Sequence, residues 1–330
     1  MNLKDYLDEL LEQNKPIVMS RLVKLSNLGP SDIKLFTAKW GLITVERRRQ
    51  IITRLEELAE TNPELDFDQI FQSCLSDPDP VVRVKAVESL AESEDYQLID
   101  LMARLLKEDN DIAVQAAAAI VLGNFALLAE LDKLPAHYAT KVRQTLFAAI
   151  DSTATDNEVK RRSIEAIAPF SLPQVKGIIT KAYHSDDLKT RCSALFAMGR
   201  NCDLKWLPIL LAELNSSDPE LRFEAAQACG EIGNEEAISG LIKVLDDSDI
   251  EVRVAAIIAL GEIGGKEAKN ALLGCLEHSD PVTQEAVEEA LAVLEFYQEP
   301  LSLTSDLDAP FCKRGGKVRL PKAGKQDAGM

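Results

Sequence analysis

The chain has 330 residues and a formal net charge of −17 at pH 7; 46% of its residues are hydrophobic and only 5% are aromatic. Its length could hold two ordinary domains, but few aromatic residues and abundant alanine are typical of closely packed short helices without a thick core. Nearly all periodic segments have helical spacing and strand signals are absent, which excludes sheet-based folds. The sequence does not start with a basic and apolar leader, so we expect a cytoplasmic rather than a secreted protein.

The first 65 residues lack the repeat that follows. Thr44 precedes an amphipathic stretch, Val45 to Leu55, which is typical of a capped helix. Terminal units of a repeat protein are atypical because one of their faces meets water. We therefore expect residues 1–65 to form a helical N-terminal cap, with the run Arg47-Arg48-Arg49 on a solvated helix face rather than at an anionic partner.

A repeat of about 31 residues occupies residues 66–295. Aspartates mark seven copies at successive spacings of 32, 45, 31, 31, 31 and 31 residues: Asp79, Asp111, Asp156, Asp187, Asp218, Asp249 and Asp280. Each aspartate is a good N-cap, because its carboxylate can accept hydrogen bonds from free backbone N–H groups. In the copy that starts at Asp249, Val252, Ala256 and Leu260 form one apolar stripe, and we expect Gly261 to weaken the helix near its end.

A second amphipathic segment precedes each cap, for example residues 237–245. Each copy is therefore predicted to be a helix–turn–helix pair, which cannot bury its apolar face without stacking on its neighbours. The sequence thus predicts an all-α fold, an α-solenoid of about seven repeats.

Four residues after each capping aspartate a basic residue recurs in five of the seven copies: Arg83, Lys160, Arg191, Arg222 and Arg253. A phosphate-binding role is one interpretation. We favour a structural ladder, in which each side chain reaches acidic or carbonyl groups of the adjoining repeat.

The spacing of 45 residues marks an insertion near residues 124–141, which is either a loop close to a binding surface or a longer helix with a passive loop. Just before it, residues 112–129 contain no charged residue, as a membrane span would. Gln115, Gly123 and Asn124 interrupt this stretch and it starts at a repeat cap, so we expect a buried helix of the solenoid and no membrane association.

The last part of the chain, residues 296–330, is expected to be a basic, disordered tail. Residues 311–330 hold six Lys or Arg and one Asp, which leaves a net charge of −22 on residues 1–310. Such a tail could bind nucleic acid, an acidic partner or the body of the protein. The candidate contact residues are Lys313, Arg314, Lys317 and Arg319.

The repeat resembles HEAT repeats, and its short form is similar to the HEAT-like repeat of the phycobilisome (PBS) lyase type. Residues 217–233 (SDPELRFEAAQACGEIG) and their copy at Asp249 to Gly264 carry the likeness. The resemblance implies a right-handed superhelix whose second helices line the concave surface. It says little about function, because one fold serves many functions.

Sequence motifs of catalysis are scarce. The three histidines, His137, His184 and His278, form no metal-binding pair, and His184 and His278 are expected in turns. The deoxyhypusine hydroxylases, a HEAT-repeat enzyme family, hold iron with repeated His-Glu pairs, whereas this chain has Phe223-Glu224 at the comparable place. We therefore expect no cofactor, no metal and no catalytic residue.

The concave side of the second helices is the candidate binding surface. At 100° per residue, Glu251, Val254 and Ile258 point away from the buried stripe. The equivalent positions give an apolar strip of Phe196, Phe223, Val254 and Ile258, with Glu220, Glu251, Glu285 and Glu289 beside it. An apolar surface rimmed by charge is typical of a partner site. We expect a protein partner that is apolar in its middle and basic at its edges.

Three functions remain open from the sequence. The first is a non-enzymatic protein-interaction scaffold. The second is a phycobilin-lyase-like protein or another enzyme-associated chaperone acting on a protein substrate, which the shared repeat type alone suggests. The third is a nucleic-acid-associated factor that uses the basic tail.

Overall fold

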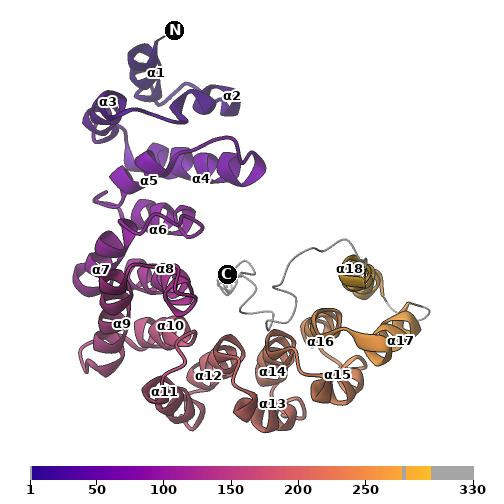
Figure 1. The fold of residues 1–330 in the computed structure, drawn as a ribbon. Coiled ribbons are helices and arrows are strands. Elements are labelled where there is room, and N and C mark those ends of the chain that lie inside the picture. The colour runs from indigo at the N-terminus through magenta and orange to yellow at the C-terminus, as the bar shows by residue number, and fades with distance from the viewer. Residues whose placement is uncertain (1, 277–279, 299–330) are drawn as a thin grey trace, which may run out of the picture. The chain divides into compact units, whose positions relative to one another are not determined.

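The computed structural model describes residues 2–276 and 280–298, with the side chains of 296–298 left out, and this part of the chain is helical throughout with no strand (Figure 1). An α-solenoid fold is thereby confirmed. The α-helices are α1 Leu3–Leu10, α2 Met19–Leu22, α3 Pro30–Trp40, α4 Val45–Thr61, α5 Asp68–Cys74, α6 Pro80–Ser89, α7 Leu98–Glu108, α8 Ile112–Glu130, α9 Ala136–Asp151, α10 Asn157–Ile167, α11 Pro173–Tyr183, α12 Leu188–Asn201, α13 Leu207–Glu213, α14 Pro219–Ile232, α15 Ile238–Val244, α16 Ile250–Ile263, α17 Gly265–Cys275 and α18 Pro281–Gln298. Three short 3-10 helices are η1 Val23–Leu25, η2 Leu204–Trp206 and η3 Glu235–Ala237.

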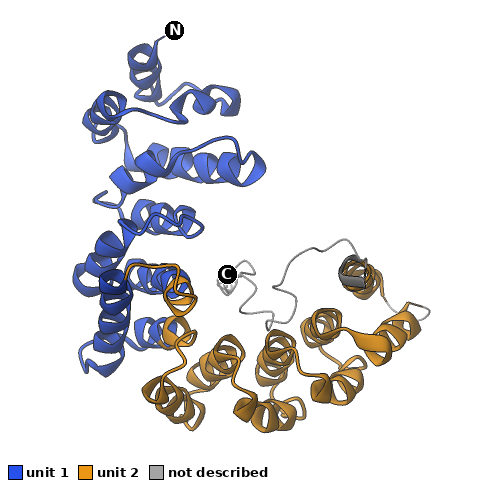
Figure 2. Ribbon diagram, viewed as in Figure 1, with its two compact units in different colours: residues 1–125, 136–163 blue, residues 126–135, 164–330 orange. Residues whose placement is uncertain are grey.

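The helices divide into two compact units, residues 1–125 with 136–163 and residues 126–135 with 164–330 (Figure 2). In unit 1, α4 packs against α6 and α7 against α9. Unit 2 has two layers: α11, α13, α15 and α17 form its outer layer, and α12, α14, α16 and α18 form its inner layer (Figure 1). Each inner-layer helix packs on the next one along the chain and on the outer-layer helix that precedes it.

All seven predicted capping aspartates accept a hydrogen bond from a backbone N–H in the first turn of their helix. The acceptor–donor pairs are Asp79–Val82, Asp111–Ala113, Asp156–Glu158, Asp187–Thr190, Asp218–Glu220, Asp249–Glu251 and Asp280–Val282. The register of the repeat is therefore set by the same local contact each time.

The predicted structural ladder forms at the four arginines of the column, Arg83, Arg191, Arg222 and Arg253, which each pair with a carboxylate of the next repeat. Arg222 forms two parallel hydrogen bonds to the carboxylate of Asp247 in the next repeat, at 2.6 and 2.8 Å, and Arg83 does the same to Asp109, at 2.8 Å each. Asp247 also accepts the backbone N–H of the next cap, Asp249, at 2.9 Å. One carboxylate thus joins the preceding inner helix to the start of the following one.

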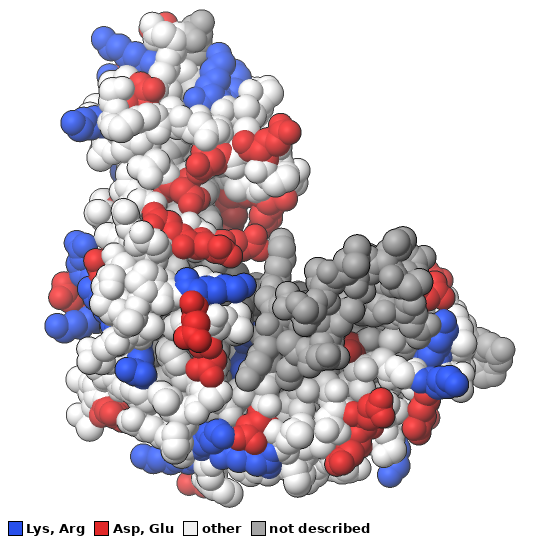
Figure 3. Space-filling model, in the orientation of Figure 1, with Lys and Arg blue, Asp and Glu red and all other residues white. Residues whose placement is uncertain are grey.

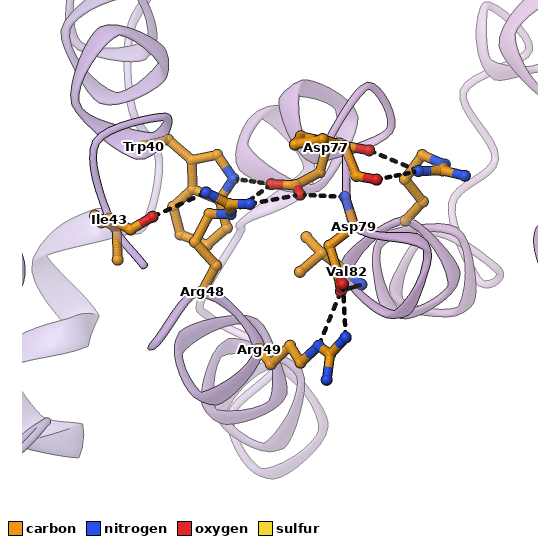
Figure 4. A network of polar contacts seen from close by, with 9 residues as sticks. Trp40, Ile43, Arg48, Arg49, Asp77, Asp79 and Val82 are labelled. Atoms are coloured by element: carbon orange, nitrogen blue, oxygen red, sulfur yellow. Dashed lines mark hydrogen bonds and ion pairs between the residues drawn. The ribbon is translucent and has the colours of Figure 1, made fainter. Parts of the chain in front are cut away.

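The same chemistry continues towards the N-terminus (Figure 4). Arg48 of α4 forms an ion pair with Asp77 at 2.9 Å, and Asp77 accepts the N–H of the cap Asp79. Trp40 of α3 donates its indole N–H to Asp77 at 2.7 Å, and Arg49 binds Asp79 at 2.6 Å. Helices α3 and α4 are therefore tied to the first marked repeat by contacts of the kind that join the repeats.

The expectation of a solvated Arg47-Arg48-Arg49 face is wrong for two of the three residues. Arg47 and Arg48 are buried, at 6% and 5% exposure. Arg47 donates to the carbonyls of Leu10 and Lys15, and so satisfies backbone groups after α1. The composition of the Arg47-Arg48-Arg49 run could not show that these side chains are buried. Their burial depends on the packing of α1 against neighbours that are distant in sequence.

Glycines inside the inner-layer helices allow close helix approach. Gly261 lies close to the end of α16, which is Ile263, and it has a packing role that the sequence did not predict. A Cβ on Gly230 would lie 2.8 Å from the Cα of Ala259, and one on Gly199 would lie 2.8 Å from the Cα of Ala228. Gly261 meets the Cβ of Ala290 at 2.9 Å in the same way. Because real Cβ atoms do not approach backbone so closely, α12, α14, α16 and α18 can pack at this distance only with glycine there.

The insertion near residues 124–141 is mostly helical. It lengthens α8 and α9 and leaves only residues 131–135 as a connection. By length and composition, helix α8 is long and apolar enough to cross a membrane. However, 56% of its apolar 18-residue stretch is buried inside the protein. Its two amides bond neighbouring backbone: Gln115 donates to the Asp109 carbonyl and Asn124 to the Ala91 carbonyl.

Candidate functional site

The eight residues of the predicted binding surface all lie on inner-layer helices of unit 2. Phe196 is on α12, Glu220 and Phe223 are on α14, Glu251, Val254 and Ile258 are on α16, and Glu285 and Glu289 are on α18. We call this set the inner face. Its role in binding stays a prediction.

Packing on α16 shows why these side chains share one side. Val252 and Leu260 are fully buried, Ala259 contacts α14 at Gly230, and Gly261 contacts α18 at Ala290. Three sides of the helix are thus occupied by neighbours. The remaining side, at 100° per residue, carries Glu251 and Ile258.

The two halves of the inner face differ in exposure. Its apolar members, Phe196, Phe223, Val254 and Ile258, are half-buried. Its acidic members, Glu220, Glu251, Glu285 and Glu289, are exposed. The apolar strip therefore offers less surface to a partner than four fully exposed side chains would. Its edges are formed by negatively charged glutamates.

Sequence reasoning missed Glu231 and Glu262 on the same side of α14 and α16. Glu262 lies one helical turn after Ile258, and Glu231 lies one turn after Gln227, the α14 residue equivalent to Ile258. The i, i+4 rule could have extended the strip to both glutamates. The Glu231 carboxylate reaches over Gly199 of α12: its Oε2 lies 3.0 Å from where a Cβ on that glycine would be. Glu262 reaches over Gly230 in the same way, so glycine makes room for both the next helix and its glutamate.

Burial and neighbouring charges shift the pKa of two groups on this side. Burial raises the pKa of the Cys192 thiol to about 12, and Glu224 and Glu220 of α14 raise it further. Burial also raises the pKa of Glu231 to about 7, which Arg200 partly opposes. Glu231 Oε2 is buried and has no hydrogen-bond partner among the described residues. Figure 3 shows that acidic side chains (red) gather densely on unit 1 and lie beside basic ones (blue) on unit 2.

Three of the described cysteines, Cys74, Cys192 and Cys229, are poor nucleophiles. Burial raises the pKa of Cys74 and Cys229 to about 12, like that of Cys192, so all three are protonated at neutral pH. His184 is the C-cap residue of α11, in the turn position predicted for it, and His278 lies outside the described residues. Within residues 2–276 and 280–298, no group of three His, Cys, Asp or Glu side chains could hold a metal ion.

The tail residues Lys313, Arg314, Lys317 and Arg319 lie outside the described part of the chain. The structure therefore leaves their predicted contacts as a prediction.

Comparison with known proteins places the repeats in a family. Residues 67–154 and 207–292, just over half of the chain, match the sequence profile of HEAT repeats. No curated protein sequence is significantly similar to the chain.

Three solved structures are similar to the chain at low sequence identity, and the first two share its fold. The complex of CpcE and CpcF of phycocyanin lyase from Nostoc sp. PCC7120 is 15% identical, with a TM-score of 0.50 over 86% of this chain and 97% of that chain. Yeast importin-beta (Kap95p) is 12% identical, with a TM-score of 0.53 over 91% of this chain and 47% of that chain. Human deoxyhypusine hydroxylase in complex with glycerol is 17% identical, with a TM-score of 0.37 over 89% of this chain and 97% of that chain.

Proposed function

Because the chain belongs to the HEAT-repeat family, we propose that it is a non-enzymatic scaffold that binds a protein segment on the inner face of unit 2. The segment is apolar in its middle and basic at its edges. The observation that carries this proposal is the placement of half-buried Phe223 and Ile258 between exposed glutamates, on the side of α14 and α16 that faces away from their packed neighbours in the described part of the chain.

The chemistry of the face supports that kind of segment. Covering the half-buried apolar side chains removes apolar surface from water, at about 25 cal/mol per Å². Lysine or arginine at the edges would pair with Glu220, Glu251, Glu285 and Glu289, which steers encounter and sets the register more than it adds affinity.

The scaffold role is tested by selecting binders from a random peptide library displayed on phage, with the full-length chain as bait. Selected peptides are expected to combine apolar residues with Lys or Arg and to bind more weakly as salt rises. The variant Phe223→Asp with Ile258→Asp should lose these peptides while its helical circular dichroism and melting temperature stay close to wild type.

A control variant replaces an apolar residue by aspartate on the outer layer instead of the inner face. Leu273 of α17 is 45% exposed, so Leu273→Asp adds a charge without touching the inner face and should leave peptide binding intact. Peptides that are acidic, or that bind the Phe223→Asp, Ile258→Asp variant as well as wild type, would remove the proposed surface.

A further inference from the structure

Residues 311–322 of this chain, Phe311 to Lys322, have the composition that the inner face selects. They hold three large apolar residues, Phe311, Val318 and Leu320. Between and after these stand five basic residues, Lys313, Arg314, Lys317, Arg319 and Lys322, with no acidic residue in the segment.

The segment is also within reach. The inner-layer helices run in one direction, because each is the second helix of its pair, and their glycine–alanine contacts recur in the same register. The chain therefore leaves α18 at Gln298, at the end of the layer where Glu231 and Glu262 lie. Fifteen residues separate Gln298 from Lys313, and a random-coil chain of that length spans about 20 Å. Packed helices lie about 8–10 Å apart, so α14 is two steps, or about 16–20 Å, from α18.

Next to the inner face, on the same side of α14, lies an acceptor that lacks a donor. Glu231 Oε2 is buried at the seam between α12 and α14 and has no hydrogen-bond partner among the described residues. Such a group costs free energy unless it is paired. A lysine or arginine lying along this seam would supply the partner.

From composition, reach and this unpartnered oxygen we infer that residues 311–322 bind the inner face of their own chain and compete there with the partner segment. The inference rests on the proposed function, because both ligands use one surface. A linker that matches the span gives the attached segment a high effective concentration, so it displaces weak ligands and leaves the face open to tighter ones.

The test uses a labelled peptide of residues 311–322 and four full-length chains: wild type, K313E/R314E/K317E/R319E (tail-reversed), the tail-reversed chain with E220K/E251K, and the tail-reversed chain with E235K/E236K. Glu235 and Glu236 are exposed at η3, outside the inner face, so they provide a matched charge change. In fluorescence anisotropy the peptide should bind the tail-reversed chain at least about tenfold more tightly than wild type. That binding should be lost with E220K/E251K and kept with E235K/E236K.

A second measurement examines the attached tail directly. Carbodiimide cross-linking of wild-type monomer should join Lys313, Lys317 or Lys322 to glutamates of the inner face, and tail reversal should abolish these links. Equal peptide affinity for wild type and the tail-reversed chain, or links spread evenly over acidic residues of both units, would overturn the inference.

Other outcomes separate this inference from the proposed function. If library peptides bind the inner face but the peptide of residues 311–322 does not, only the inference fails. If tail reversal removes salt-sensitive binding of poly(U) RNA and no cross-links to the inner face form, the tail serves nucleic acid and the inference is again overturned.

Discussion

Gly230 of α14 and Ala259 of α16 approach so closely that a Cβ on the glycine would lie 2.8 Å from the alanine Cα. The same pairing recurs between Gly199 and Ala228 and between Gly261 and Ala290. Because the inner-layer helices lie so close together, Glu231 and Glu262 can reach across to the preceding helix. The small residues of the repeat therefore determine both how the helices of unit 2 pack and where these two carboxylates lie.

Gly230→Ala should destabilise the protein, although alanine favours helices more than glycine does. The added methyl group meets the backbone of Ala259 and the Glu262 carboxylate, and such overpacking costs about 1–3 kcal/mol. Urea denaturation measures the loss. Gly177→Ala in α11 is the control: nothing lies within 4 Å of its added Cβ, so it should stabilise by about 0.5–1 kcal/mol. Equal effects of the two substitutions would show that close packing does not require the glycine.

Glu231→Gln should raise stability at neutral and alkaline pH only. The pKa of Glu231 rises from an ordinary 4.5 to about 7 in the folded protein because burial disfavours the charged form. Between these values the unfolded chain releases a proton that the folded chain keeps, so wild type loses stability as pH rises through this window. Thermal melting as a function of pH should show wild type and variant alike below pH 4.5 and the variant higher above 7. A constant difference at all pH values would contradict a buried, titrating Glu231.

Separating Arg222 from Asp247 should weaken the junction between their repeats. Their side chains are 14% and 10% exposed and share two hydrogen bonds, which are each worth about 1.5–3 kcal/mol when a charged group takes part. A double-mutant cycle with Arg222→Met and Asp247→Asn gives the coupling. The exposed pair Lys15–Glu12 is the comparison and should show much weaker coupling, because water screens both charges.

The same pair predicts a direction for acid unfolding. Hydrogen bonds from Arg222 lower the pKa of Asp247, so its contribution is present above the ordinary aspartate value of 3.8 and is lost as pH falls through the lowered value. Asp247→Asn should therefore flatten the stability profile in this acid range. An unchanged profile would show that the pair contributes nothing.

Asp77→Ala should destabilise strongly, by about 3–5 kcal/mol, because it leaves the buried Arg48 without its counter-charge. It also removes the acceptor for the Trp40 indole and for the Asp79 N–H. Asp77→Asn keeps an acceptor oxygen and should fall between alanine and wild type in urea denaturation. A loss below about 1 kcal/mol for alanine would mean that the N-terminal helices are not held by this network.

The repeat could be read from the sequence because each of its features is local. An aspartate cap forms hydrogen bonds within its own helix only. An arginine four residues later reaches the next repeat in the same way each time, because successive repeats are stacked alike. Burial of Arg47 and Arg48 was not readable, since it depends on helices α1 and α3 that carry no period. The close approach of Gly261 to Ala290 was not readable for a related reason, because it depends on where the neighbouring helix α18 lies.

The candidate site was only partly predictable. Helical periodicity placed Glu251 and Ile258 on one side of α16, and the structure keeps them there between neighbours on the other three sides. Glu231 and Glu262 were missed because they fall beyond the trio considered in each repeat. The partial burial of Phe223 could not be derived either, because it depends on how close α14 and α16 lie.

Photo-cross-linking from single positions tests the binding surface most directly. A benzophenone amino acid replaces Phe223 on the inner face in one full-length chain and Leu273 on the outer layer in another, and each is irradiated with a peptide selected from the library. We expect the peptide to be attached at position 223 and not at 273. Attachment at 273 as strong as at 223, or none at 223 while the peptide binds, would contradict a partner site on the inner face.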